Sequence, residues 1–322
     1  MEYRLRTKTP QFEIASAYGQ RFGGKLVVCW RAQSIVRVML ARAPSAILRV
    51  AMMVAGIALL AACVAFNHHD VLPIADRSVR TSDVAFLSRD QHFRALPVSA
   101  LGRQVTAYYI ETEKAHGVLF AIGGNGNSSE PLLRELSPRA EALGLDLLVL
   151  SYYLRGEPTP TIAQVRAAAD ATLEAVGNLP TPASANIYLL GHSMGCWFAT
   201  DLAARFPVKG LILASAGTTI AETFGQEWFP LNLVVRFGSD EDVAQLDSVR
   251  DAQFIHVPTI VFSSDNDDVI PRAQTQRVFD ALPMETRKKF IVLSKVSHVT
   301  YLEKNRVWTA VEKFFDLPEK QP

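Results

Sequence analysis

The chain of 322 residues is long enough for one large α/β domain with additional segments, and a hydrophobic content of 49% can supply a sizeable core. Its formal net charge of +1 argues against a broadly basic surface that binds nucleic acid. The charge is unevenly distributed, because residues 1–62 contain nine Lys or Arg and only two acidic residues. A basic leader ahead of a mildly acidic remainder predicts a targeting segment.

An uncharged apolar run occupies residues 50–66, directly after Arg42 and Arg49, which is the layout of a signal peptide. Near its end, residues 60–63 (Leu-Ala-Ala-Cys) resemble the bacterial lipobox, and the resemblance implies cleavage before Cys63 and lipidation of its thiol. The alternative is an uncleaved anchor helix, because the run is close to the lower length limit for a spanning helix. Both alternatives predict a membrane-anchored protein of the cell envelope, with the remainder of the chain outside the cytoplasm.

Composition divides the chain into a leader (1–62), a polar tether (63–89) and a folded domain (90–322). Residues 1–38 are long for the start of a signal peptide, so Met39 is an alternative start of translation. A chain cut before Cys63 would keep Cys196 as its only free thiol. No intrachain disulfide is therefore expected.

In the folded domain, short apolar or alternating runs are interspersed with longer amphipathic segments. The short runs predict strands at 93–98, 104–111, 117–122, 146–150, 185–190, 210–214, 259–263 and 288–293. The longer segments predict helices at 132–143, 162–176 and 194–206, with Pro138 expected to kink the first helix or delay its start. Strands that alternate with helices predict an α/β fold whose central sheet is mostly parallel, with two antiparallel opening strands.

The motif Gly-His-Ser-Met-Gly at residues 191–195 lies between a predicted strand and a predicted helix. In that context G-x-S-x-G is typical of a nucleophile elbow, a tight turn that holds its central serine in strained backbone angles. The two glycines remove side chains where strand and helix nearly touch. The motif therefore predicts Ser193 as a nucleophile and the backbone N–H of Met194 as a donor to an oxyanion.

A glycine-rich turn at residues 123–129 follows the buried run 117–122 and lacks the G-x-G-x-x-G spacing of dinucleotide-binding turns. With this turn and the elbow, residues 93–316 resemble an α/β-hydrolase, closest to serine hydrolases of the serine aminopeptidase-like type. That group reads His-Gly-Asn-x-x-Asn at the glycine-rich turn, where this chain has Gly123 in place of the histidine. The resemblance implies an α/β-hydrolase fold with a small cap, and a second oxyanion donor at the N–H of Asn125.

The resemblance also implies a triad whose acid and histidine follow the serine in the chain. After the predicted strand 259–263 the family pattern is Gly-x-x-Asp-x-x-Val/Ile-Pro. Counting back four residues from Pro271 gives Asp267, with Asp265 and Asp268 as alternatives. The acid would hold the imidazole in one tautomer and stabilise the imidazolium.

His298 lies just past the last predicted strand, where the family places its general base. It would accept the proton of Ser193 and return it to the leaving group. Residues 216–257 are rich in large apolar side chains and predict a small cap segment. These side chains would either form an acyl-binding wall or pack the cap onto the domain, and we expect a modest apolar pocket.

These features predict a membrane-tethered serine hydrolase that cleaves a small acyl ester, thioester or lipid through an acyl-enzyme, using Ser193, His298 and Asp267. One alternative is a peptidase or amidase, as in the aminopeptidase relatives. Another is a catalytically silent domain that acts as a binding module on the envelope. The chemistry requires no cofactor or metal, and the sequence names no protein partner.

Overall fold

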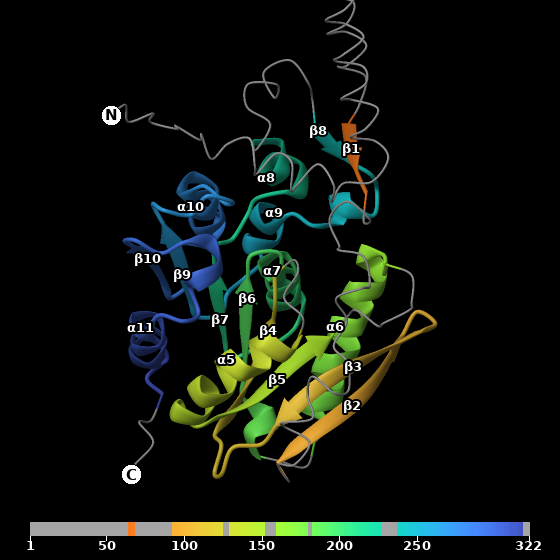
Figure 1. Ribbon diagram of the computed structural model, residues 1–322, viewed down its shortest axis with the longest axis vertical. Coiled ribbons are helices and arrows are strands. Elements are labelled where there is room, and N and C mark those ends of the chain that lie inside the picture. The colour runs from red at the N-terminus through yellow and green to blue at the C-terminus, as the bar shows by residue number, and fades with distance from the viewer. Residues whose placement is uncertain are drawn as a thin grey trace, which may run out of the picture. The chain divides into compact units, whose positions relative to one another are not determined.

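The computed structural model describes residues 64–67, 92–124, 129–151, 159–179, 182–226 and 237–317. Their main feature is an eight-stranded sheet with helices packed on it (Figure 1). The strands of this sheet are β2 (Phe93–Ala100), β3 (Arg103–Ile110), β4 (Gly117–Ile122), β5 (Leu145–Ser151), β6 (Ile187–His192), β7 (Gly210–Ala214), β9 (Thr259–Ser264) and β10 (Lys288–Leu293).

The strand order is β10-β9-β7-β6-β4-β5-β3-β2. β2 pairs with β3 and β3 pairs with β5 in antiparallel orientation, and the other neighbours are parallel. The predicted α/β class, with a mostly parallel sheet and an antiparallel opening pair, is thus confirmed. All eight strands overlap the runs that the apolar pattern predicted.

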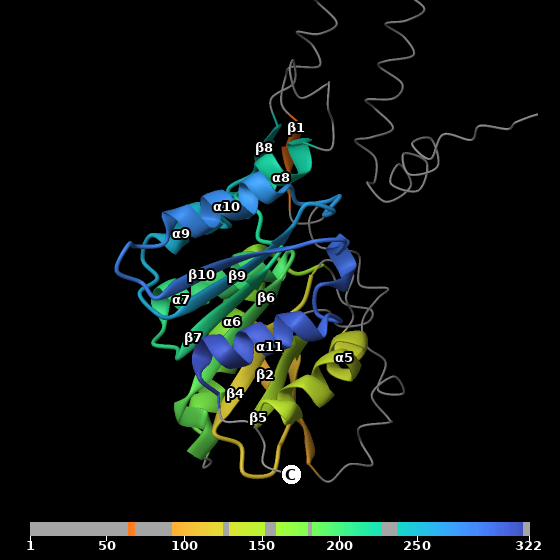
Figure 2. The same ribbon diagram turned by 90° about the vertical axis from the view of Figure 1, so that its left-hand side faces the viewer.

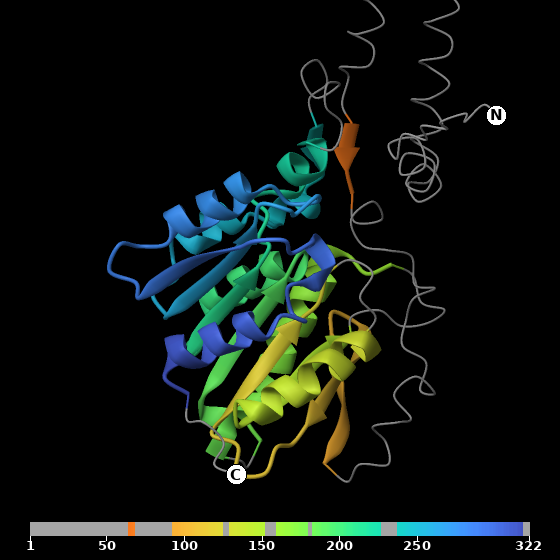
Figure 3. The same ribbon diagram turned by 60° about the vertical axis from the view of Figure 1, so that its left-hand side comes forward.

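Helices cover both faces of the sheet. They are α5 (Ser129–Ala142), α6 (Ile162–Gly177), α7 (Gly195–Arg205), α8 (Ile220–Gln226), α9 (Ser248–Ala252), α10 (Arg272–Ala281) and α11 (Asn305–Phe315), with 3-10 turns η2 (Pro182–Ala185), η4 (Val243–Gln245) and η5 (His298–Thr300). α5 and α11 lie on one face and α6 and α7 on the other (Figures 2 and 3). None of the helices in the described ranges has the length and apolar character that crossing a membrane requires.

The core consists of the strand side chains and the helix faces packed against them. Every residue of β4, β5, β6 and β7 is buried, because helices exclude water from both faces of the central strands. On the α5 and α11 face, one hydrophobic cluster joins Leu133 and Leu136 of α5 to Leu119 and Leu190 of the sheet. Trp308 of α11 belongs to the same cluster.

The sequence pattern was least accurate for the helices. α5 begins at Ser129 and continues through Pro138, which was expected to kink or delay it. Proline removes one helical donor, but it lies on the exposed side, and burial of leucines on the inner side offsets that loss. α10 and α11 were not predicted, although the buried side chains of α11 recur at helical spacing, as Val307, Trp308, Val311 and Phe314.

A second, two-stranded sheet pairs β1 (Val64–Phe66) with β8 (Phe237–Ser239). The alternative of an uncleaved helix through residues 50–66 therefore does not hold for its last three residues, which form a strand within the predicted tether at 63–89. The leader at 1–62, with Met39, and the tether residue Cys63 lie outside the described residues. So do residues 152–158 and the centre of the predicted cap, residues 227–236.

The strand order determines where a site can form. β4 lies between β5 and β6 in the sheet. The chain passes from β4 through α5 to β5 on one side of β4, and it then crosses back through α6 to form β6 on the other side. In open parallel sheets the crevice at such a switch point, beyond the carboxyl ends of the strands, is the usual binding position. The turn after β4 and the elbow after β6 both lie at this crevice.

Candidate active site

The turn after β6 has the backbone of a nucleophile elbow. Ser193 follows β6 directly and has a φ of 54°, which a residue with a side chain adopts only under strain. Its N–H donates to the carbonyl of Ala214 at the end of β7, at 3.0 Å. Two residues later α7 begins at Gly195, where a Cβ would lie 1.9 Å from the carbonyl oxygen of Ile122. Only glycine fits there, because the elbow and β4 are in backbone contact.

Three side chains from distant parts of the chain form a continuous hydrogen-bonded series. Nε2 of His298, in η5, lies 2.7 Å from Oγ of Ser193. Nδ1 of the same ring lies 3.0 Å from Oδ1 of Asp267, in the loop after β9. If Nδ1 carries the ring proton and donates to the carboxylate, Nε2 is left to accept from the serine hydroxyl. That is the arrangement required for removing the serine proton.

The loops that carry Asp267 and His298 are joined to each other. Oγ of Ser264 donates to the carbonyl of Val296 at 2.7 Å. Oδ1 of Asn266 accepts from the N–H of Lys295 at 3.0 Å. β9 and β10 are parallel neighbours, so both loops leave the sheet at the same edge. These bonds therefore set the position of the imidazole relative to the carboxylate.

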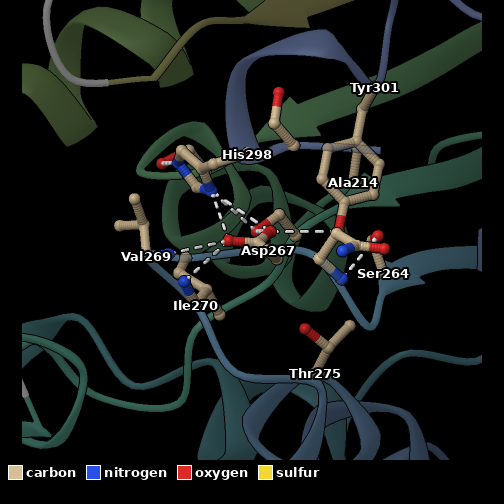
Figure 4. Close-up of polar contacts among 12 residues, drawn as sticks. Ala214, Ser264, Asp267, Val269, Ile270, Thr275, His298 and Tyr301 are labelled. Carbon is tan, nitrogen blue, oxygen red and sulfur yellow. Dashed lines mark hydrogen bonds and ion pairs between the residues drawn. The ribbon is translucent and has the colours of Figure 1, made fainter. Parts of the chain in front are cut away.

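Five donors surround the carboxylate of Asp267, whose side chain is fully buried (Figure 4). Oδ1 accepts from the N–H groups of Val269 (3.0 Å) and Ile270 (2.9 Å) as well as from His298. Oδ2 accepts from Oγ of Ser215 at 2.6 Å and from the hydroxyl of Tyr301 at 3.0 Å. Burial raises the pKa of Asp267, but the bonds from His298, Ser215 and Ile270 outweigh it and lower the pKa to about 2. Asp267 is thus ionised at neutral pH.

The rival acids do not contact this imidazole. Asp265 is exposed and pairs with Arg272, with an oxygen 3.1 Å from Nη1. Asp268 is exposed on the same loop. Of these three acids, only Asp267, four residues before Pro271, contacts His298. The sequence count and the geometry therefore select the same carboxylate.

Sequence reasoning did not identify Ser215 or Tyr301 as part of this group. Ser215 directly follows β7, just as Ser193 directly follows β6, so its place at the carboxyl end of an adjacent strand was a signal that could have been used. Tyr301 lies three residues after His298 in the turn that carries the imidazole, and its ring is wholly buried. Nothing in its local sequence distinguishes it from a core tyrosine.

His192, the residue before the serine, contacts the turn that carries His298. Its Nε2 lies 2.8 Å from the backbone carbonyl of His298, so Nε2 carries a proton and donates. The two rings are tilted with centroids 5.5 Å apart. Burial and the neighbouring His298 ring lower the pKa of His192 to about 4, so the side chain is neutral at pH 7. It joins the elbow to the turn of the predicted base.

The oxyanion prediction is only partly within the described residues. Met194 precedes the first residue of α7, where backbone N–H groups have no intrahelical acceptor. The glycine-rich turn comes close to the nucleophile, because a Cβ on Gly124 would lie 3.0 Å from Cβ of Ser193. Asn125, the predicted second donor, lies outside the described residues.

Cys196, in the first turn of α7, is a buried free thiol beneath the elbow. Its Sγ lies 3.2 Å from the carbonyl of Gly191 and 3.3 Å from that of Ala214, and burial raises its pKa. Across the residues that the structure describes, no group of three or more His, Cys, Asp or Glu is arranged to hold a metal ion.

Comparison with curated proteins gives relatives without a described function. No protein-family model matches the chain. Two proteins of Mycobacterium tuberculosis, from two strains and both named only as uncharacterized proteins, are 28% identical to it over 181 residues. The match covers 54% of this chain and 60% of each relative, so the chain spans less than two thirds of their length.

Solved structures show a clear likeness in fold. An esterase of Pyrococcus furiosus superposes with a TM-score of 0.56 at 13% identity, covering 70% of this chain and 91% of the esterase. Est1E of Butyrivibrio proteoclasticus gives 0.55 at 19%, covering 68% and 96%. An acylaminoacyl peptidase of Pyrococcus horikoshii gives 0.56 at 12%, covering 76% of this chain and 45% of the peptidase. The protein has the α/β-hydrolase fold.

In this α/β-hydrolase fold the sequence-predicted residues follow three of the four consecutive strands β6, β7, β9 and β10. Ser193 follows β6, Asp267 follows β9 and His298 follows β10, while β7 lies between the first two. The fold expectation is confirmed by these comparisons and by the strand order. At such low identity the likeness carries no information on substrate.

Proposed function

We propose that the protein is a serine hydrolase that cleaves a carboxylic ester or thioester through an acyl-enzyme. The observation that carries the proposal is the unbroken series from Oγ of Ser193 through the imidazole of His298 to the buried carboxylate of Asp267, at 2.7 and 3.0 Å. A serine hydroxyl is a weak nucleophile by itself and needs an oriented base. This series supplies the base and the group that orients it.

In the proposed reaction Oγ of Ser193 attacks the acyl carbon while Nε2 of His298 takes the serine proton. The negative oxygen that forms is stabilised by the N–H of Met194 and that of Asn125. The tetrahedral species collapses, the bond to the alcohol or thiol breaks, and His298 returns the proton to that leaving group. Water then attacks the acyl-enzyme with His298 again as base, which releases the acid and restores Ser193.

Ester and thioester substrates are favoured over amides because their leaving groups need less help from the acid. The alternative activity, peptide or amide hydrolysis, uses the same three residues with a poorer leaving group. A panel of p-nitrophenyl esters of increasing acyl length, acyl thioesters and aminoacyl amides separates these classes by kcat/KM. Preference for the amides would overturn the ester assignment while leaving the nucleophile in place.

Labelling with a fluorophosphonate tests the nucleophile. Ser193→Ala removes the attacking oxygen, so we expect labelling to disappear and ester turnover to fall by several orders of magnitude, roughly 10⁶-fold. Ser263→Ala is a matched control, because Ser263 is buried in β9 and its hydroxyl has no hydrogen-bond partner among the described residues. Undiminished labelling of a folded Ser193→Ala protein would contradict Ser193 as the nucleophile, whereas no labelling of the wild type would favour a catalytically silent domain.

We also propose that the hydrolase is a lipoprotein of a bacterial cell envelope, held at a membrane outside the cytoplasm. β1 begins at Val64, directly after Cys63, so a chain cut before Cys63 keeps this strand whole. An uncleaved anchor helix would have to end before Val64, which leaves residues 50–63, 14 in all. A helix of that length spans about 21 Å, less than the roughly 30 Å of the hydrocarbon core.

Cys63→Ser tests this anchor. For a lipoprotein the change blocks lipidation and processing, so a heavier precursor accumulates and labelled fatty acid is no longer incorporated. The precursor should be heavier by the whole leader, or by the shorter segment from Met39 if translation starts there. Unchanged mobility on a gel, with no fatty acid in the parent protein, would contradict the lipoprotein proposal.

A further inference from the structure

Ser215 occupies a strained and completely buried position at the end of β7. Its φ is 61°, in the left-handed region that residues with a side chain rarely adopt, and its side chain has no exposed surface. Its N–H donates to the carbonyl of Phe262 in β9 at 3.0 Å. A strained non-glycine residue persists where its surroundings determine its conformation, and such residues cluster at functional sites.

The hydroxyl of Ser215 contacts both partners of the acid–histidine pair. Oγ donates to Oδ2 of Asp267 at 2.6 Å and lies 3.1 Å from Nδ1 of His298. Because Oγ of Ser215 donates its proton to the carboxylate, a lone pair of the same oxygen can accept from the N–H at Nδ1 of His298. The ring therefore has two oxygen acceptors beside the same nitrogen, one from the end of β7 and one from the loop after β9.

We infer that Ser215 is a positioning residue for the Asp267–His298 pair. This inference rests on the proposed function. The strand order explains the contact, because β7 and β9 are neighbours in the sheet. A side chain at the end of β7 can therefore bond both the carboxylate after β9 and the imidazole that this carboxylate holds.

Glycine at position 215 separates this role from a merely structural one. It removes the hydroxyl but suits the left-handed backbone, so relief of strain should offset much of the stability lost with the hydrogen bond to Asp267, and the melting temperature of Ser215→Gly should change little. Loss of a hydrogen bond to a charged group should lower kcat by roughly 10-fold, with little change in KM. If Ser215 only stabilised the fold, activity would instead follow stability.

The outcomes are distinguishable from failure of the proposed function. If Ser193→Ala still reacts with the fluorophosphonate, the proposed function is wrong, whatever the variants at 215 do. If Ser193→Ala is inactive but folded Ser215→Gly keeps kcat within twofold of the wild type, the positioning role is overturned. Ser263→Ala again serves as the control, with wild-type kcat expected.

Discussion

The clearance at Gly195 gives a prediction whose size follows from the coordinates. A Cβ at this position would lie 1.9 Å from the carbonyl oxygen and 2.6 Å from the carbonyl carbon of Ile122, and 2.9 Å from the carbonyl oxygen of Gly123. Ordinary contact begins near 3.4 Å, so Gly195→Ala must separate α7 from the end of β4 by roughly 1.5 Å. All three atoms belong to the backbone, so a side-chain rotation cannot relieve the clash.

The expected cost of Gly195→Ala has two parts. Overpacking of a close-packed core destabilises by about 1–3 kcal/mol, and this backbone clash should lie at the upper end of that range. The moved segment leads into the glycine-rich turn beside Ser193, and a displacement of about 1 Å at a reacting group costs roughly 10²-fold in rate. We therefore expect Gly195→Ala to lose about 3 kcal/mol of stability and roughly 10²-fold in the rate of fluorophosphonate labelling.

Urea denaturation followed by circular dichroism measures the first quantity, and the rate of labelling measures the second. Gly177→Ala is the matched control, because nothing among the described residues lies within 4 Å of a Cβ built at the end of α6. That variant should be neutral or more stable by about 0.5–1 kcal/mol. Wild-type stability and labelling in Gly195→Ala would refute the reasoning that the elbow and β4 are in obligatory backbone contact.

Two further predictions concern the site. Asp267→Asn should lower kcat by roughly 10³–10⁴-fold, because an amide favours the wrong tautomer of His298. Asp265→Asn and Asp268→Asn should retain activity. A larger loss of kcat in Asp268→Asn than in Asp267→Asn would contradict the assignment of the acid. His192 has a folded pKa of about 4, below the 6.5 of the unfolded chain, so the unfolded state binds a proton first and stability falls as pH decreases from 6.5 to 4. That loss of stability amounts to about 3 kcal/mol. His192→Gln keeps a donor but does not titrate, so urea denaturation at pH 7 and pH 4 should show a much smaller loss of stability in this variant. The same pH dependence in both proteins would contradict the assignment to His192.

Local sequence was sufficient for the elements whose side chains follow one repeating pattern. The short, largely apolar runs of β4, β5, β6 and β7 indicate strands buried on both faces, and the glycines around Ser193 specify a turn that side chains would block. The family pattern before Pro271 then gave Asp267, with Asp265 and Asp268 as alternatives, and the position after the last predicted strand gave His298. Proline was a weaker guide, as the continuous helix through Pro138 shows.

Tertiary structure decided what depends on the order of strands in space. Ser215 and Asp267 are 52 residues apart, and their hydrogen bond exists because β7 and β9 are neighbours in the sheet. His192 and His298 are 106 residues apart and meet because the elbow and the turn after β10 leave the sheet at the same edge. A local pattern records which face of a strand is buried, but it does not record which strand lies beside it. The sequence alone therefore predicted the strands of the main sheet and proposed three principal side chains, while the groups that hold the carboxylate and the imidazole in place were decided by the packing of the sheet.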